Sequence, residues 1–292
     1  MSKRPAHKAA TENATPSTTP GAGDEFYSIS DPQAQVEYVA VRRAARWVPF
    51  FLPHLRPGMR LLDCGCGVGS ITLDLAEIVA PGETVGVDMD NGQLELARAT
   101  ATTRGLNNAR FEVASVYELP YADASFDAAL AHTLLFHLSE PLRALKELRR
   151  VLAPGGIVAV ADDDYSTWVV TPEDSAMRWA MAELAPKIIA ANGGSPFYSG
   201  NLRHLLLEAG FAQTEGFAIA AEHYGTLEET RRYAAVVARM MANPDMVRLV
   251  LAQEWATADE IAARRADVLA WGERPDAFAA VMYCAALGWV EE

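Results

Sequence analysis

Cysteine is scarce in this sequence, which has only three cysteines among 292 residues. Three cysteines do not make a disulfide framework, and Cys64 and Cys66 lie too close together along an extended turn to favour a bridge. No second group of cysteines and histidines at metal-ligand spacing accompanies them, so we expect no metal site. Both observations favour a reducing, cytoplasmic environment.

Positive charge is also in short supply. Lys and Arg number 25 against 38 Asp and Glu, which gives a formal net charge of -13. A surface that binds nucleic acid needs clustered positive charge to neutralise the phosphates. We therefore expect no nucleic-acid partner.

Long apolar runs are missing as well. The first 24 residues are rich in Ala, Thr, Pro, Ser and Gly, and they contain no apolar stretch that could form the core of a signal peptide. No later segment is apolar over the length that a bilayer requires. We expect residues 1–24 to form a disordered tail and the chain to contain no membrane span.

What the sequence does contain is a regular alternation of strand and helix patterns. We predict strands at residues 60–63, 84–88, 109–113, 128–131, 157–161, 214–221 and 278–289. Helices are predicted at residues 32–50, 70–79, 91–104, 141–152 and 201–209. Strands that alternate with long helices imply an α/β fold with a mostly parallel sheet and helices on both faces. Ligands of such a sheet bind at the carboxyl ends of its strands.

The alternation is interrupted twice after residue 161. Residues 165–199 have a helical pattern and supply no obvious strand, and capping boxes at Thr226 and Thr257 open two further helices. We interpret both segments as helical insertions that form a cap over the carboxyl edge of the sheet. The predicted organisation is a tail (1–24), a core (25–165), an insertion (166–199), a core helix and strand (200–225), a second insertion (226–275) and a final core strand (276–292).

The most informative motif is LLDCGCGVGS, residues 61–70, where an apolar strand enters a turn with glycine at every second position. Glycine has no Cβ, so such a turn tolerates positive φ and lets the backbone approach a ligand. About one βαβ unit later, VGVDM at residues 85–89 ends the second strand in an acid. Nicotinamide and flavin enzymes favour the spacing G-x-G-x-x-G, whereas position 70 here is serine, so an oxidoreductase is the less favoured alternative.

A further motif, SFDAALAH at residues 125–132, covers the predicted fourth strand. Together with the glycine turn and the acids Asp63 and Asp88, it makes the region from about residue 60 to residue 162 resemble a known family. This family is the class I S-adenosylmethionine-dependent methyltransferases of the small-molecule, ubiquinone-biosynthesis-like type. The resemblance implies a Rossmann-like, doubly wound, seven-stranded sheet and S-adenosylmethionine as cofactor, with S-adenosylhomocysteine as product. A non-catalytic module that binds the same cofactor remains the alternative from a different class.

The resemblance also implies the cofactor contacts. The methionine part is expected against the glycine turn with Asp63 near the ammonium group, the ribose hydroxyls at Asp88, and the adenine between Met89 and Ser115. The full predicted set is Tyr27, Asp63, Gly65, Cys66, Gly67, Asp88, Met89, Ser115, Val116 and His132. A simple capping role for Asp63 and a core-filling role for Met89 stay open.

Two histidines follow the fourth strand, where the methyl group and its acceptor are expected to meet. Methyl transfer is an in-line displacement, so a base is needed only when the acceptor must lose a proton. We predict His132 and His137 as candidates for that base, although a strand-end histidine can also simply cap backbone groups.

The acceptor itself is predicted to be a small, aromatic or apolar metabolite, methylated on oxygen, nitrogen or carbon. Its expected contacts are Asp162, Tyr165, Trp168 and Tyr198. Aromatic side chains of the cap suit a flat substrate, but the same residues also serve as packing between cap and core. The sequence leaves the atom methylated and a homodimer open.

Overall fold

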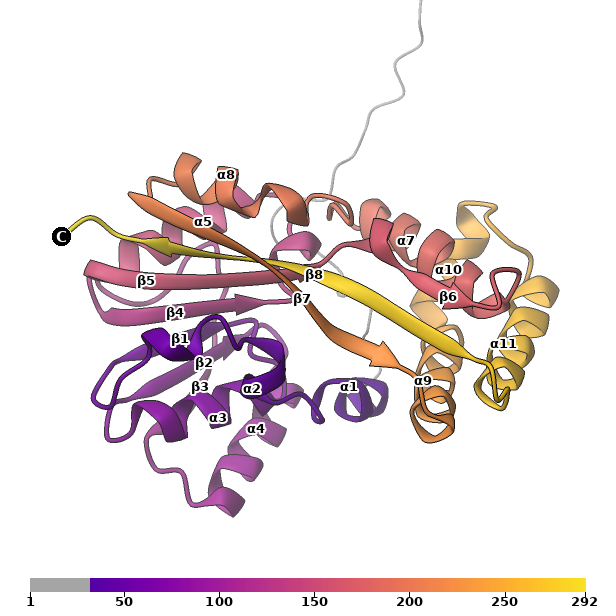
Figure 1. Ribbon diagram of the computed structural model, residues 1–292, viewed down its shortest axis with the longest axis horizontal. Coiled ribbons are helices and arrows are strands. Elements are labelled where there is room, and N and C mark those ends of the chain that lie inside the picture. The colour runs from indigo at the N-terminus through magenta and orange to yellow at the C-terminus, as the bar shows by residue number, and fades with distance from the viewer. Residues whose placement is uncertain (1–31) are drawn as a thin grey trace, which may run out of the picture.

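The computed structural model describes residues 32–292, so the predicted tail and Tyr27 lie outside the described residues. Its centre is an eight-stranded sheet in the order β3-β2-β1-β4-β5-β8-β6, with β7 paired to β8 (Figure 1). The strands are β1 (Leu61–Cys64), β2 (Thr84–Asp88), β3 (Ala109–Val113), β4 (Phe126–His132), β5 (Leu152–Asp163), β6 (Val169–Thr171), β7 (Gln213–Tyr224) and β8 (Phe278–Trp289).

Helices surround this sheet. The α-helices are α1 (Pro32–Val39), α2 (Ala44–Trp47), α3 (Ser70–Val79), α4 (Asn91–Arg104), α5 (Pro141–Val151), α6 (Ala176–Arg178), α7 (Ala185–Ala191), α8 (Leu202–Glu208), α9 (Leu227–Met240), α10 (Pro244–Ala252) and α11 (Ala258–Gly272). Short 3-10 helices are η1 (Leu52–His54), η2 (Leu135–His137), η3 (Tyr165–Thr167) and η5 (Ser199–Asn201), and η4 (Trp179–Leu184) is a π-helix.

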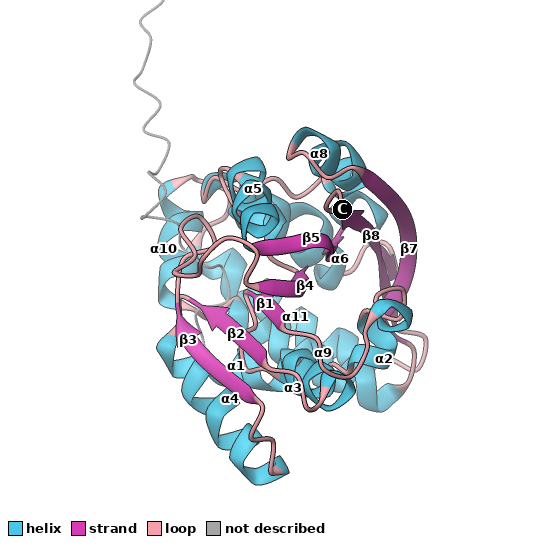
Figure 2. Cartoon of the chain, turned by 90° about the vertical axis from the view of Figure 1, so that its left-hand side faces the viewer, coloured by secondary structure: helices cyan, strands magenta, loops and turns pink. Residues whose placement is uncertain are grey.

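The sheet is parallel from β3 to β5 and antiparallel beyond. β8 runs antiparallel to β5, from Ile157 opposite Trp289 to Asp163 opposite Tyr283. β7 is antiparallel to β8 on its other side and forms the edge of the sheet (Figure 2). This arrangement confirms the predicted α/β class and its mostly parallel sheet.

Side chains alternate between the two faces of β5, and this alternation sets the direction of its last residues. Ala159 and Ala161 pack in the cluster that contains α2 and α3, whereas Val158 and Val160 pack in the cluster that contains α5 and α8. Because successive strand residues point to opposite faces, Asp162 and Asp163 also point to opposite faces.

The helices of both predicted insertions gather at the end of the molecule toward which β4 points (Figure 1). α9 packs against α11 and α1, and α10 packs against α7. The long strands β7 and β8 continue from the core into this group, which we call the cap and define as residues 166–199 and 226–272. The two predicted capping boxes are present, with Thr226 and Glu229 opening α9 and Thr257 and Glu260 opening α11.

Two predictions about the helices were wrong. The single helix predicted at residues 32–50 is divided, because Arg43 is extended and Asp74 accepts a hydrogen bond from the backbone N–H of Ala44, which starts α2 anew. The second insertion contains three helices rather than two. The additional one, α10, begins at Asn243, whose side chain caps it, followed by a proline at its first position.

The expectation that residues 165–199 supply no strand was also wrong. Val169, Val170 and Thr171 form β6, which pairs with the part of β8 that extends beyond β5. Three residues are too few to show an alternating pattern, so their β-branched side chains were the only local signal.

Candidate active site

The glycine turn lies between β1 and α3. Gly65, Gly67 and Gly69 all have positive φ, at 71°, 54° and 73°. At Gly69 a Cβ would also lie 3.0 Å from the ring of Phe111, so both conformation and space require glycine there. The turn is fastened to the end of β2, because the N–H of Gly65 donates to the carbonyl of Val87 and the N–H of Gly67 donates to Asp88.

Two carboxylates flank this turn. Asp63 is buried and accepts a hydrogen bond of 2.6 Å from the hydroxyl of Thr72. Burial raises its pKa to about 7, against the lowering effect of the Thr72 hydrogen bond, and the charge of Asp88 raises it further. Asp88 accepts one backbone N–H on each oxygen, from Gly67 and Asp90, both at 2.9 Å, and burial raises its pKa too. A carboxylate offers about four lone pairs, so both acids can still accept hydrogen bonds.

Asp63 and Asp88 line a cavity of about 380 Å³, which we call the glycine-turn cavity. Nine of the predicted cofactor contacts line it, namely Asp63, Gly65, Cys66, Gly67, Asp88, Met89, Ser115, Val116 and His132. Met89 is 68% exposed and therefore forms part of the rim. The tenth predicted contact, Tyr27, lies outside the described residues.

The chain after β4 forms the inner wall of this cavity. Thr133 has a positive φ of 56°, an uncommon conformation for a residue with a branched side chain. Its hydroxyl lies 2.8 Å from Nδ1 of His132 and accepts a hydrogen bond from Arg42. Burial and the charge of Arg42 hold the pKa of His132 well below its usual value, and burial lowers the pKa of His137 to about 3. Both imidazoles are therefore neutral at physiological pH.

A second cavity, of about 80 Å³, adjoins the first, and we call it the cap cavity. The two cavities share Arg42, Thr133 and His137 in their walls. The cap cavity is otherwise lined by aromatic residues and by aliphatic residues of the cap, together with Asp163. The geometry thus joins a polar, acid-lined cavity to a smaller, apolar one.

Residues 55–209 match the family described as a methyltransferase domain. The chain belongs to the class I S-adenosylmethionine-dependent methyltransferases. The probable methyltransferase ltbC of Aspergillus luteorubrus is 31% identical over 87% of this chain and 93% of its own length. An O-methyltransferase of Pyrenophora dematioidea is 33% identical over 63% of this chain and 66% of its own. Among solved structures, the cyclase SpnF is 26% identical to this chain and superimposes on it with a TM-score of 0.52. The superposition covers 88% of this chain and 81% of the SpnF chain.

Membership of this family confirms the predicted enzyme class and makes the oxidoreductase alternative wrong. Within residues 32–292 of the methyltransferase, no helix has the length and apolar character needed to cross a membrane. The same residues bring no three metal-ligating side chains together in a metal-binding group.

Of the four predicted acceptor contacts, only Tyr165 lines one of these two cavities. Asp162 is fully buried on the face of β5 that packs against α5 and α8. There it accepts hydrogen bonds from the N–H of Leu134 and the hydroxyl of Tyr198. Asp162 and Tyr198 therefore hold the turn after β4 in place, and neither lines the glycine-turn cavity or the cap cavity. The pKa of Asp162 is raised to about 7, because the effect of burial exceeds the lowering effect of these hydrogen bonds.

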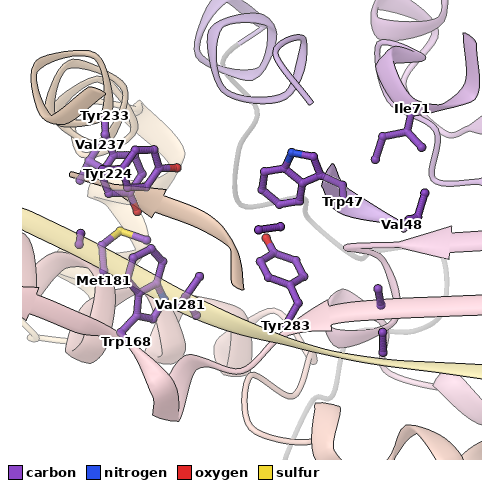
Figure 3. Close-up of a cluster of buried hydrophobic side chains, with 14 of the residues drawn as sticks. Trp47, Val48, Ile71, Trp168, Met181, Tyr224, Tyr233, Val237, Val281 and Tyr283 are labelled. Carbon is purple, nitrogen blue, oxygen red and sulfur yellow. The ribbon is translucent and has the colours of Figure 1, made fainter. Parts of the chain in front are cut away.

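Trp168, the remaining predicted acceptor contact, also lies outside the walls of both cavities. Its side chain is 5% exposed and stacks on Tyr233, with ring centroids 6.1 Å apart (Figure 3). Trp168 therefore packs in the apolar cluster against Tyr233 of α9. These contacts are of the kind expected for packing between cap and core.

Sequence reasoning missed three residues that the fold brings to the site. Arg42 is 5% exposed and lies in both cavity walls, although the pattern placed it within a continuous helix. Thr133 had no local signal, because its role comes from a backbone conformation that a sequence pattern does not reveal. Asp163 belongs to a run of three aspartates, residues 162–164, for which the sequence favours Asp162 as the acceptor contact.

Proposed function

We propose that this methyltransferase binds S-adenosylmethionine in the glycine-turn cavity and transfers the methyl group to a small, apolar or aromatic acceptor in the cap cavity. The observation that carries the proposal is the wall shared by the two cavities at Arg42, Thr133 and His137. Ligands in adjoining cavities meet at such a junction. Positioning of the two reactants accounts for much of the rate of a displacement reaction.

The residues present fit the cofactor. S-adenosylmethionine carries a positive sulfonium and a positive ammonium group, and the glycine-turn cavity presents three carboxylates, those of Asp63, Asp88 and Asp90. Asp63 would take the ammonium group and Asp88 the ribose hydroxyls, with Met89 and Ser115 toward the adenine. When bound, the cofactor supplies an electrophilic methyl group that a nucleophile displaces from sulfur.

The chain supplies a base and a positive charge beside that methyl group. Nε2 of His132 is buried, lines the glycine-turn cavity and has no hydrogen-bond partner within residues 32–292. With Nδ1–H donating to Thr133, Nε2 can accept the proton of an acceptor hydroxyl. The Arg42 guanidinium lowers the pKa of a hydroxyl bound nearby. Both features favour oxygen as the methylated atom, and a relative named O-methyltransferase supports this choice.

The direct test has two steps. Calorimetric titration measures binding of S-adenosylmethionine to the purified chain, and a panel of phenols is then screened for formation of S-adenosylhomocysteine. We expect binding, and turnover with at least one phenol that falls when His132 is replaced by glutamine. Absence of binding at millimolar cofactor would reject the proposal, whereas tight binding without turnover of any acceptor would indicate a non-catalytic module.

Cofactor affinity should depend on the ionisation of Asp63. Its pKa of about 7 means that the carboxyl is protonated in acid and ionised above neutrality. Because the cofactor ammonium attracts the ionised form, affinity should rise with pH by up to about tenfold per unit below pH 7 and level off above it. Calorimetry between pH 5.5 and 7.5 measures this, with Asp63→Asn as comparison. An unchanged slope in Asp63→Asn would assign the pH dependence to another group, such as Asp88.

A further inference from the structure

Asp163 lines the cap cavity, and one of its carboxylate oxygens has no hydrogen-bond partner among the described residues. The residue is 4% exposed, and this oxygen is Oδ1. It is the only aspartate of the described chain in the wall of this cavity. Nearly all buried polar atoms in folded proteins are hydrogen-bonded, so a buried oxygen that lines a cavity without a partner indicates a ligand.

The neighbouring acid, Glu222, is already hydrogen-bonded. Both oxygens of Glu222 accept tyrosine hydroxyls, Oε1 from Tyr38 and Tyr224 and Oε2 from Tyr283. Arg42 donates to Thr133. Asp163 is therefore the acid of this region that remains available to a molecule in the cavity.

The electrostatic surroundings favour a ligand that donates a hydrogen bond. Burial raises the pKa of Asp163 well above its usual range, and the charges of Glu222 and Asp162 raise it further, while Arg42 opposes them. Asp163 therefore interacts electrostatically with two other acids, Asp162 and Glu222, and with one guanidinium. A hydroxyl or N–H group directed at Oδ1 is favourable there, because a hydrogen bond to a carboxylate stabilises its ionised form.

The rest of the wall is apolar and adaptable. Four methionines line the cap cavity, together with leucine, isoleucine and valine side chains: Met181, Met240, Met241, Met246, Leu184, Ile188, Ile189 and Val237. Methionine side chains adjust to irregular shapes, so this wall can bind apolar molecules of different shapes with little discrimination between them. Discrimination between acceptors then depends on the few polar groups of the wall.

We propose that Asp163 selects the acceptor by accepting a hydrogen bond from a hydroxyl or N–H group on an otherwise apolar, ring-sized molecule. This inference rests on the proposed function, in which the cap cavity holds the acceptor. It transfers to Asp163 the acceptor-orienting role that the sequence suggested for Asp162. The two residues differ because the alternation of β5 turns Asp163 toward the cap and Asp162 away from it.

Two probes of nearly equal size test the proposal, 4-fluorophenol and 4-fluorotoluene. Line broadening in fluorine NMR gives the dissociation constant of each, with and without saturating S-adenosylhomocysteine. The wild-type chain should bind the phenol about tenfold more tightly, as expected for one additional hydrogen bond in a buried site. Asp163→Leu, which has a similar shape but no acceptor, should bind both probes equally, and Asp163→Asn should keep part of the preference.

Asp174→Asn is the matched control, because Asp174 is an exposed aspartate of the cap that lines neither cavity. It should keep the wild-type preference. Equal binding of the two probes by the wild-type chain, or an undiminished preference in Asp163→Leu, overturns the proposal. Failure of the proposed function is seen separately, as absence of cofactor binding in calorimetry, because the probe preference is also measured without cofactor.

Discussion

An Asp88→Ala variant is expected to bind S-adenosylmethionine at least ~100-fold more weakly than the wild-type chain. In the proposed site, two ribose hydroxyls donate hydrogen bonds to this carboxylate. Each hydrogen bond to a charged group contributes about 1.5–3 kcal/mol. Loss of both bonds costs about 3–6 kcal/mol on that scale. The substitution also removes the acceptor of the Gly67 N–H, which holds the glycine turn against the end of β2, and that of the Asp90 N–H in the turn that follows β2.

Calorimetric titration of the variant and the wild-type chain measures this effect. Asp88→Asn separates its two causes, because the amide oxygen still accepts the N–H of Gly67 while the negative charge is lost; we expect an intermediate affinity. Glu183→Gln, an exposed position that lines neither cavity, is the control and should bind as the wild type does. An Asp88→Ala affinity within about fivefold of wild type would contradict the assignment of the ribose to Asp88.

The position of the acids around the glycine turn could be predicted because it follows from local patterns. Asp63 and Asp88 lie at or near the ends of two strands joined by one helix, and such strands become parallel neighbours. Their carboxyl ends then meet at one edge of the sheet. Alternating glycines between the first strand and its helix completed the pattern, and the family resemblance that this pattern carries named nine of the residues that line the cavity.

The acceptor end could not be predicted in the same way, because its residues come together only through tertiary packing. The predicted strand ended at residue 161, whereas β5 continues to Asp163, and the run of three aspartates has no apolar alternation that shows which of them faces the cap. Arg42 enters the site only because the first helix breaks before α2. A broken helix and the face of a strand end both depend on distant contacts.

Glu222 illustrates the same limit and leads to the largest expected effect on stability. In the sequence it is one acid in the segment AAEHY, typical of an exposed strand end. In the structure it is 1% exposed and accepts hydroxyls from three tyrosines, Tyr38 of α1, Tyr224 of β7 and Tyr283 of β8. It therefore joins the N-terminal helix to the two strands that carry the cap.

Glu222→Ala should lower the free energy of unfolding by about 3–5 kcal/mol. Three tyrosine hydroxyls lose their hydrogen-bond acceptor, and each buried hydroxyl without a partner costs about 1–3 kcal/mol. Removal of a buried carboxylate offsets part of this loss. Such a loss is a large share of the stability of a typical domain, about 5–15 kcal/mol. Urea unfolding followed by circular dichroism measures it. Glu222→Gln keeps an acceptor oxygen in place and should lose less than half as much. A loss below about 1 kcal/mol in Glu222→Ala would mean that the tyrosines find other partners and that α1 is held by its apolar contacts alone.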